Sequence, residues 1–148
     1  MVVPAFKAII KPATTKQRGD RAEDDALKLL QQAGLRLLER NYRTPGRGGG
    51  EIDLIMREPD GTVVFVEVRQ RRNARHGGAL ASVTSVKQRR LVFAARHYLL
   101  RWPQLPPCRF DVVAIDAVDG AVVAYKHYAP RTAAAARATA ASALLALL

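Results

Sequence analysis

A chain of 148 residues, 49% of them hydrophobic, suits one domain with a core of its own. The 24 lysines and arginines against 13 acidic residues give a net charge of +11, which favours a polyanionic partner, nucleic acid before an anionic membrane, over charge that serves solubility alone. The lone cysteine, Cys108, excludes a disulfide framework, and no apolar run reaches the roughly 18 residues of a transmembrane helix, so we expect a cytoplasmic protein without membrane association.

Three segments are expected from composition: a flexible basic tail at residues 1–17, a folded domain at residues 18–130, and an Ala/Leu-rich tail or helix at residues 131–148 that docks or frays. The domain begins with a predicted helix over Arg18–Gln32, whose alanines and leucines recur at helical spacing before Gly34. Glu23 lies at the edge of this apolar stripe, and from periodicity alone it is a solvated acid that pairs with a neighbouring base.

Residues 35–42 are predicted to form a strand, followed by a glycine-rich loop over Thr44–Gly50. The glycines either let a nucleic-acid backbone approach closely or serve as a plain flexible connector. Next comes a predicted hairpin, Gly50–Met56 and Val63–Arg69, joined at a turn that contains Asp60-Gly61.

The hairpin carries acids inside its two apolar strands, Asp53 in the first and Glu67 in the second. A buried carboxylate is costly unless a cation, a hydrogen-bond network or a metal compensates it. Because residues two apart in a strand share a face, Glu51 would point with Asp53, and Arg69 with Glu67. If those faces coincide, the carboxylates form an oxygen-ligand site for a hard cation such as Mg²⁺.

A basic segment follows the hairpin, and a long helix is predicted over Ser82–Trp102, capped by Ser82 or Thr84. Cations beside an acidic pocket are typical of phosphate contacts that lead into a metal site. The predicted nucleic-acid-binding residues are Arg71, Arg72, Arg75, Lys87 and Arg90, with Arg89 beside them. His76 is a phosphate contact, a base or neither.

Strands are predicted at Arg109–Asp116 and Ala121–Tyr128. Asp111 is either a further acid of the site or a local partner at the start of its strand. A helix between the third and fourth strands implies a parallel pair inside a mixed sheet, hence an α/β or α+β fold with helices flanking the sheet. In that arrangement the first helix lays Glu23 over the face that carries Asp53 and Glu67.

Asp53 followed by Glu67-Val68-Arg69 resembles the D…(D/E)xK signature of the PD-(D/E)XK nuclease superfamily. The stretch from Gly19 to Asp116 resembles the YraN-like family of small bacterial proteins more closely, and that family is similar in fold to archaeal Holliday junction resolvases. The matching motifs are Gly19-x-x-Ala22-Glu23-x-x-Ala26, Arg40-Asn41-Tyr42-Arg43, Gly50-Glu51-Ile52-Asp53-Leu54-Ile55, Val64-Phe65-Val66-Glu67-Val68-Arg69-x-Arg71, Lys87 with Arg90-Leu91, and Arg109-Phe110-Asp111-Val112-Val113.

The resemblance implies a restriction-endonuclease-like αβββαβ core, with Glu23, Asp53 and Glu67 as catalytic metal ligands for Mg²⁺ or Mn²⁺ and Arg69 as the active-site cation. Two positions depart from the family pattern: Ala22 replaces a glycine, and Arg69 replaces the usual lysine. Arginine stays charged and cannot take a proton. Three hypotheses result: a metal-dependent DNA endonuclease, a non-catalytic DNA- or RNA-binding protein, and a protein whose basic face meets an acidic partner. A homodimer is left open.

Overall fold

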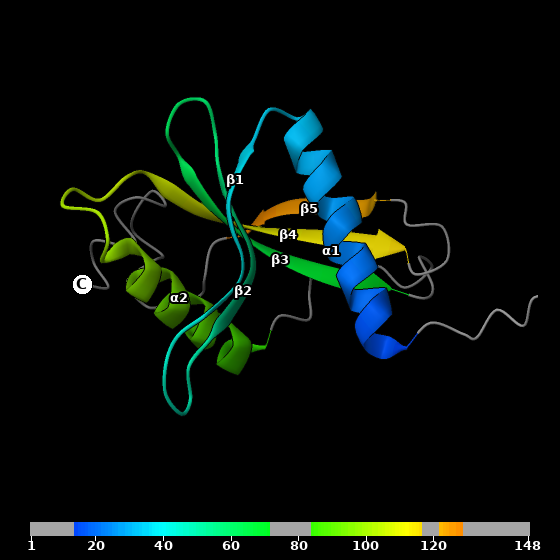
Figure 1. Cartoon of the computed structure of the whole chain (residues 1–148), viewed down its shortest axis with the longest axis horizontal. Helices are drawn as coiled ribbons and strands as arrows, with labels where there is room; N and C mark the ends of the chain where they lie inside the picture. Colours follow the sequence, from blue (N-terminus) through cyan, green and yellow to red (C-terminus); the bar gives the residue numbers. More distant parts are fainter. Residues whose placement is uncertain (1–13, 72–83, 117–121, 129–148) are drawn as a thin grey trace, which may run out of the picture.

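The computed structural model describes residues 14–71, 84–116 and 122–128. In these ranges the chain forms two helices and five strands (Figure 1). In chain order they are α1 (Thr15–Gln32), β1 (Arg36–Arg43), β2 (Glu51–Arg57), β3 (Val63–Arg71), α2 (Ser85–Leu99), β4 (Cys108–Asp116) and β5 (Val122–Tyr128). Arg71 ends β3, and the predictions for Arg72, Arg75, His76 and the tail at residues 131–148 lie outside the described residues.

The strands form one sheet in the order β1-β2-β3-β4-β5. Neighbouring strands are antiparallel except β3 and β4, which are parallel and are connected through α2. A mixed sheet with one parallel pair beside a helical crossover was predicted, and the α+β class is confirmed. No helix within the described ranges is long and apolar enough to cross a membrane.

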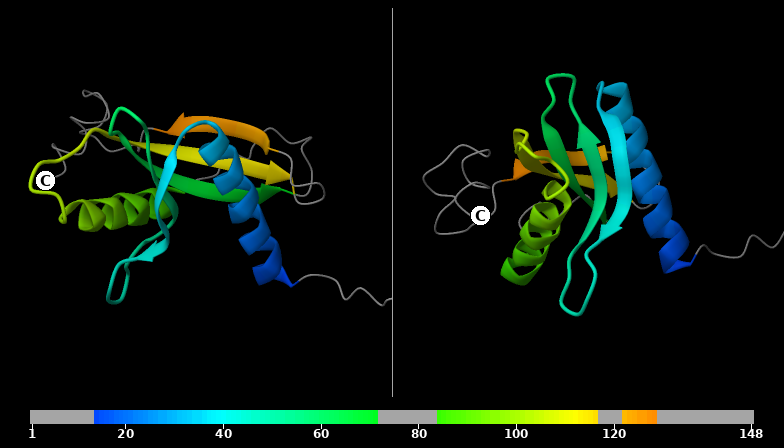
Figure 2. Two further views of the ribbon diagram at one scale, coloured as in Figure 1. Left: turned by 45° about the horizontal axis from the view of Figure 1, so that its top comes forward. Right: turned by 60° about the vertical axis from the view of Figure 1, so that its left-hand side comes forward.

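The two helices cover opposite faces of the sheet, which gives two apolar layers (Figure 2). Leu91, Ala95 and Tyr98 of α2 pack in one cluster with Phe65 of β3. Ala22, Ala26 and Leu30 of α1 pack in the other cluster, together with Val64 and Val66. Because successive strand residues alternate between faces, odd-numbered residues of β3 face α2 and even-numbered residues face α1.

Both helices begin at a threonine cap. Helix α1 begins at Thr15 rather than Arg18, because Thr14 and Gln17 form a capping box that satisfies backbone N–H groups at the helix start. Helix α2 is shorter than the predicted 82–102 segment. Thr84 accepts a 3.2 Å hydrogen bond from the N–H of Lys87 at its start, and the helix ends at Leu99.

Gly50, in the glycine-rich loop, has a packing role that neither prediction for that loop included. It directly precedes β2 and packs against α2, where an added Cβ would lie 2.0 Å from the carbonyl oxygen of Arg90. No side chain fits at that distance, so glycine is required for the close approach of strand and helix. The preceding loop is closed by Thr44, whose Oγ1 accepts a 2.8 Å hydrogen bond from the N–H of Gly50.

Candidate metal centre

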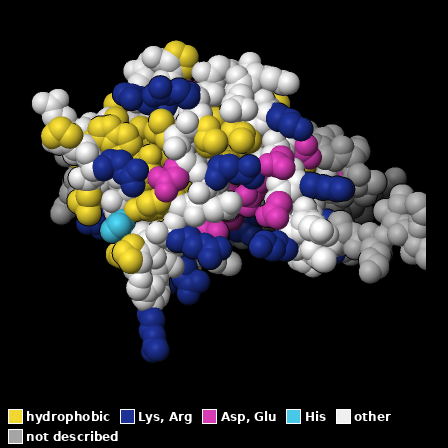
Figure 3. All heavy atoms as spheres, in the orientation of Figure 1, with side chains coloured by type: hydrophobic (Ala, Val, Ile, Leu, Met, Phe, Trp, Pro, Cys, Tyr) yellow, Lys and Arg dark blue, Asp and Glu magenta, His cyan; other side chains and the backbone are white. Residues whose placement is uncertain are grey.

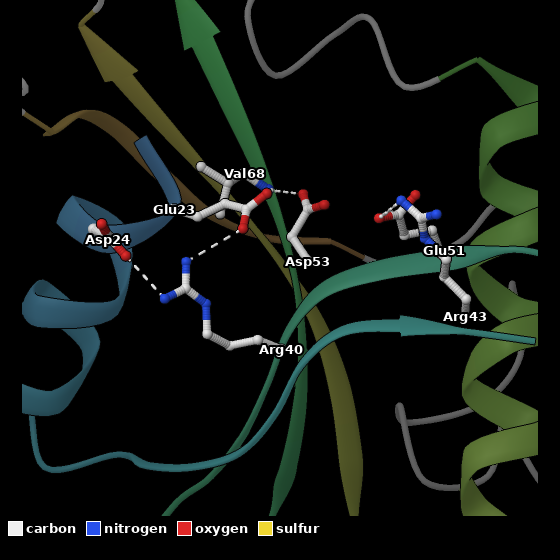
Figure 4. A network of polar contacts seen from close by, with 7 residues as sticks. All are labelled: Glu23, Asp24, Arg40, Arg43, Glu51, Asp53 and Val68. Carbon is white, nitrogen blue, oxygen red and sulfur yellow. Dashed lines mark hydrogen bonds and ion pairs between the residues drawn. The ribbon is translucent and has the colours of Figure 1, made fainter. Parts of the chain in front are cut away.

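The candidate site lies where β2 and β3 part. The two strands pair from Arg57–Val63 to Leu54–Val66, and the next residue on each strand is an acid, Asp53 or Glu67. Beyond the last pair, a side chain continues the bonding: Asp53 Oδ2 accepts a 2.7 Å hydrogen bond from the backbone N–H of Val68 (Figure 4). The two carboxylates therefore lie where the pairing of β2 and β3 ends.

Strand β2 changes its alternation at Asp53. Ile52 packs in the layer under α2, whereas Leu54, two residues later, packs under α1. On β1, Asn41 lies between the register pairs Arg40–Leu54 and Tyr42–Ile52, hence opposite Asp53, and it has a left-handed φ of 50°. Both strands bend at this position, so Asp53 lies between the two faces of the sheet.

Glu67 belongs to the face that α2 covers, which corrects the expectation that α1 lays Glu23 over the same face as Glu67. By strand alternation Glu67 shares its face with Phe65. Its side chain is only 6% exposed, and its Oε1 lies 3.2 Å from Lys87 Nζ of α2 and 3.3 Å from Arg69 Nε. Its Oε2 is buried and has no hydrogen-bond partner in the described structure.

The electrostatics of Asp53 reflect this crowding. Burial, and then the negative charge of Glu67, raise the pKa of Asp53 to about 7. The hydrogen bond from Val68 and the positive charge of Lys87 act in the opposite direction, and Glu51 adds a smaller increase. A divalent cation would relieve this destabilisation of the ionised Asp53 carboxylate.

Glu23 approaches Asp53 from α1. Arg40 Nη2 lies 3.4 Å from Glu23 Oε2, and its Nη1 donates to Asp24 at 2.8 Å (Figure 4). The predicted pairing with a neighbouring base is thus confirmed, but the Glu23 side chain is only 15% exposed and not solvated as expected. Burial and the charge of Asp53 raise the pKa of Glu23, while hydrogen bonds from Asn41 and Arg40 oppose this increase.

Two other acids are engaged elsewhere. Glu51 pairs with Arg43 at 3.1 Å on the exposed side of the β1–β2 hairpin. Asp111 lies 3.2 Å from Arg109, two residues earlier on β4, so the local alternative for Asp111 is confirmed. Figure 3 shows that acidic side chains gather along α1, with lysines and arginines around them.

The three expected ligands do not form one group. In the parts of the chain that the structure describes, no three His, Cys, Asp or Glu side chains are arranged to hold a metal ion. The reason is the topology: Glu67 lies under α2 and Glu23 projects from α1, with Asp53 between them. The pair formed by Asp53 and Glu67 still fits Mg²⁺, which is commonly bound by one or two carboxylates together with water and phosphate oxygens.

Sequence reasoning missed the position of Lys87. It was predicted as a phosphate contact, yet its ammonium group lies against Glu67. The one available signal was the helix start, because Thr84 as the cap fixes which residue of the first turn lies next to β3. Arg90, by contrast, lies on the exposed side of α2.

The fold and this cluster define a class: an α+β domain with a mixed sheet that carries a buried acid pair at the parting of two strands. The sequence model of uncharacterised protein family UPF0102 matches residues 22–115, and the chain belongs to that family, which confirms the expected YraN-like membership. The matched region contains Glu23, Asp53, Glu67, Arg69 and Lys87, the residues of the candidate site.

Similar proteins have the same family name. A UPF0102 protein of Albidiferax ferrireducens is 68% identical over 116 residues, which cover 78% of this chain and 89% of that protein. One from Polaromonas naphthalenivorans is 68% identical over 108 residues, covering 73% and 71% of the two chains. One from Paracidovorax citrulli is 66% identical over 110 residues, covering 73% and 82%.

Proposed function

We propose that this protein is a Mg²⁺- or Mn²⁺-dependent endonuclease that hydrolyses phosphodiester bonds in DNA. The observation that supports this most is Oε2 of Glu67, which is buried and has no hydrogen-bond partner among the described residues. It lies near Asp53, whose ionised form is destabilised by burial and by the charge of Glu67. Buried polar atoms in folded proteins are almost always satisfied, so a carboxylate oxygen of this kind, close to a second carboxylate, is suited to bind a cation or an ordered water.

Asp53 and Glu67 would hold the cation together with water and phosphate oxygens, and Glu23 would act on the site through its negative charge near Asp53. The bound ion would supply an activated water and neutralise charge on the phosphate. Arg69 has a side chain that is 29% exposed and stays fully charged. It would therefore stabilise negative charge on the reacting phosphate without transferring a proton.

The net charge of +11 supports nucleic acid as the substrate class. Arg89 and Arg90 lie exposed on α2, on the element that also supplies Lys87 to the cluster. With Arg71, Arg72 and Arg75 they would track the DNA backbone towards the acid pair. A cytoplasmic location suits this activity and the lone, buried Cys108.

The test is a cleavage screen with branched, single-stranded and linear DNA in Mg²⁺, Mn²⁺, Ca²⁺ or EDTA. We expect cleavage in Mg²⁺ or Mn²⁺ and none in EDTA. Asp53→Asn and Glu67→Gln should abolish it, while Asp20→Asn, which removes an exposed acid of α1, should leave it unchanged. Absence of cleavage by the parent on every substrate contradicts the proposal.

A second candidate is a non-catalytic DNA- or RNA-binding protein on the same fold. It is favoured by Arg69 in place of a lysine and by the absence of a three-ligand group within residues 14–71, 84–116 and 122–128. Nucleic-acid binding that is unaffected by EDTA, without cleavage, would select it.

A further inference from the structure

The two carboxylate oxygens of Glu67 have different contacts. Its Oε1 receives both cations of the cluster, Lys87 Nζ at 3.2 Å and Arg69 Nε at 3.3 Å, while the buried Oε2 has no hydrogen-bond partner in the described structure. The Nε of Arg69 has no hydrogen-bond partner among the described residues, so its approach to Oε1 is an ion pair only, and the ammonium group of Lys87 is the contact that orients the carboxylate. The same contacts leave the second oxygen available to a further ligand.

We propose that Lys87 is the positioning residue of the metal centre: it holds Oε1 of Glu67, so that Oε2 is presented to the divalent cation. This inference rests on the proposed function. It assigns different roles to the two cations, because Arg69 comes from the same strand as Glu67 and its Nε lies 3.3 Å from Oε1 without forming a hydrogen bond. Lys87 comes from a different element and reaches across to the sheet.

The backbone of α2 is held in place both before and after Lys87. Before it, Thr84 caps the helix by accepting a 3.2 Å hydrogen bond from the N–H of Lys87 itself. After it, the carbonyl of Arg90 packs against Gly50, the residue directly before β2. The first turn of α2 is thereby fixed relative to the strand that carries Asp53. Because the backbone at Lys87 is fixed, its flexible side chain can reach only a few positions.

Lys87 also acts on the second acid of the pair, because its charge opposes the rise in the pKa of Asp53. Carboxylates that bind metals are themselves held by hydrogen bonds from outer partners, whose loss typically weakens metal binding or activity by about 10–100-fold. Lys87 matches such a partner, because its ammonium group contacts Glu67 and its backbone is held by the cap of α2.

The test measures Mn²⁺ affinity by electron paramagnetic resonance in the intact protein. Lys87→Leu should weaken binding by about 10–100-fold. Lys87→Gln, which keeps an N–H donor for Oε1, should weaken it less. Lys28→Leu removes an exposed lysine of α1 and should leave affinity unchanged.

The direction of the change in Mn²⁺ affinity distinguishes a positioning role of Lys87 from a purely electrostatic one. Removal of a nearby positive charge would, by Coulomb's law alone, tighten Mn²⁺ binding. Equal or tighter binding in both Lys87 variants overturns the inference while the metal centre stands. No Mn²⁺ binding by the parent protein overturns the metal centre and this inference together. Lys87→Gln preserves most of the side chain's volume, which keeps the test valid if Lys87→Leu does not fold.

Discussion

Asp53 accepts a 2.7 Å hydrogen bond from the backbone N–H of Val68, immediately beyond the last paired residues of β2 and β3. The side chain thus does what a strand carbonyl does elsewhere in the ladder. It keeps the strands together at their parting and holds one carboxylate beside the other. An asparagine at position 53 retains this acceptor and removes only the charge.

Asp53→Asn should therefore remove a pH dependence of stability. The folded pKa of Asp53, about 7, lies above the ordinary aspartate pKa of 3.8, so between these values the native state binds more protons than the unfolded state. The free energy of unfolding of the metal-free protein should then fall as pH rises from 4 to 7 and level off above 7.

Urea unfolding in EDTA at pH 5 and pH 8 measures this effect. Each pKa unit corresponds to about 1.4 kcal/mol, so we expect Asp53→Asn to be more stable than the parent by at least that amount at pH 8. Asp20→Asn is the matched control and should follow the parent. Identical pH profiles for Asp53→Asn and the parent would show that Asp53 is not destabilised in the fold.

Gly50→Ala should disrupt the contact between β2 and α2, because its Cβ would lie 2.0 Å from the Arg90 carbonyl oxygen. Overpacking of this kind costs about 1–3 kcal/mol or more. Gly19→Ala is the control: no atom lies within 4 Å of its added Cβ, and alanine favours the helix by up to about 1 kcal/mol. Thermal unfolding should separate the two variants in opposite directions, and equal stability would contradict the packing role of Gly50.

Substitution of Arg69 tests how the site handles charge on the phosphate. If arginine is an adequate electrostatic substitute, Arg69→Lys should change the single-turnover cleavage rate little. Arg69→Ala should then cost about 2.7–4 kcal/mol of transition-state stabilisation, as lost transition-state donors typically do. A clear gain in Arg69→Lys would instead show that the chemistry requires a lysine. No cleavage by all three proteins, with DNA binding intact, would favour the non-catalytic candidate.

The basic segment after β3 should carry phosphate contacts. Each neutralised phosphate contributes about −0.9 to the slope of log affinity against log salt for B-DNA. The triple change of Arg71, Arg72 and Arg75 to alanine should flatten that slope and weaken binding evenly across sequences. Fluorescence anisotropy over a salt series measures it. An unchanged slope would place the DNA surface elsewhere.

The element order, the parallel pair and the acids themselves were predictable, because periodicity, turn residues and motif spacing are local properties of a sequence. The placement of the acids was not. The rule that residues two apart share a face fails at Asp53, where the β1–β2 hairpin bends opposite Asn41. Likewise, the contact between Lys87 and Glu67 depends on how closely α2 packs on Gly50, and no pattern within either segment encodes that distance.

Calorimetric titration of the protein with Mn²⁺ tests the central claim most directly. We predict that the parent binds Mn²⁺ more tightly at pH 8 than at pH 6, because binding requires ionised Asp53. Asp53→Asn and Glu67→Gln should lose this binding and remain folded in EDTA. The contradictory result is a parent that does not bind Mn²⁺ at either pH, with both variants destabilised by about 3–5 kcal/mol, as expected for acids that only pair with buried cations.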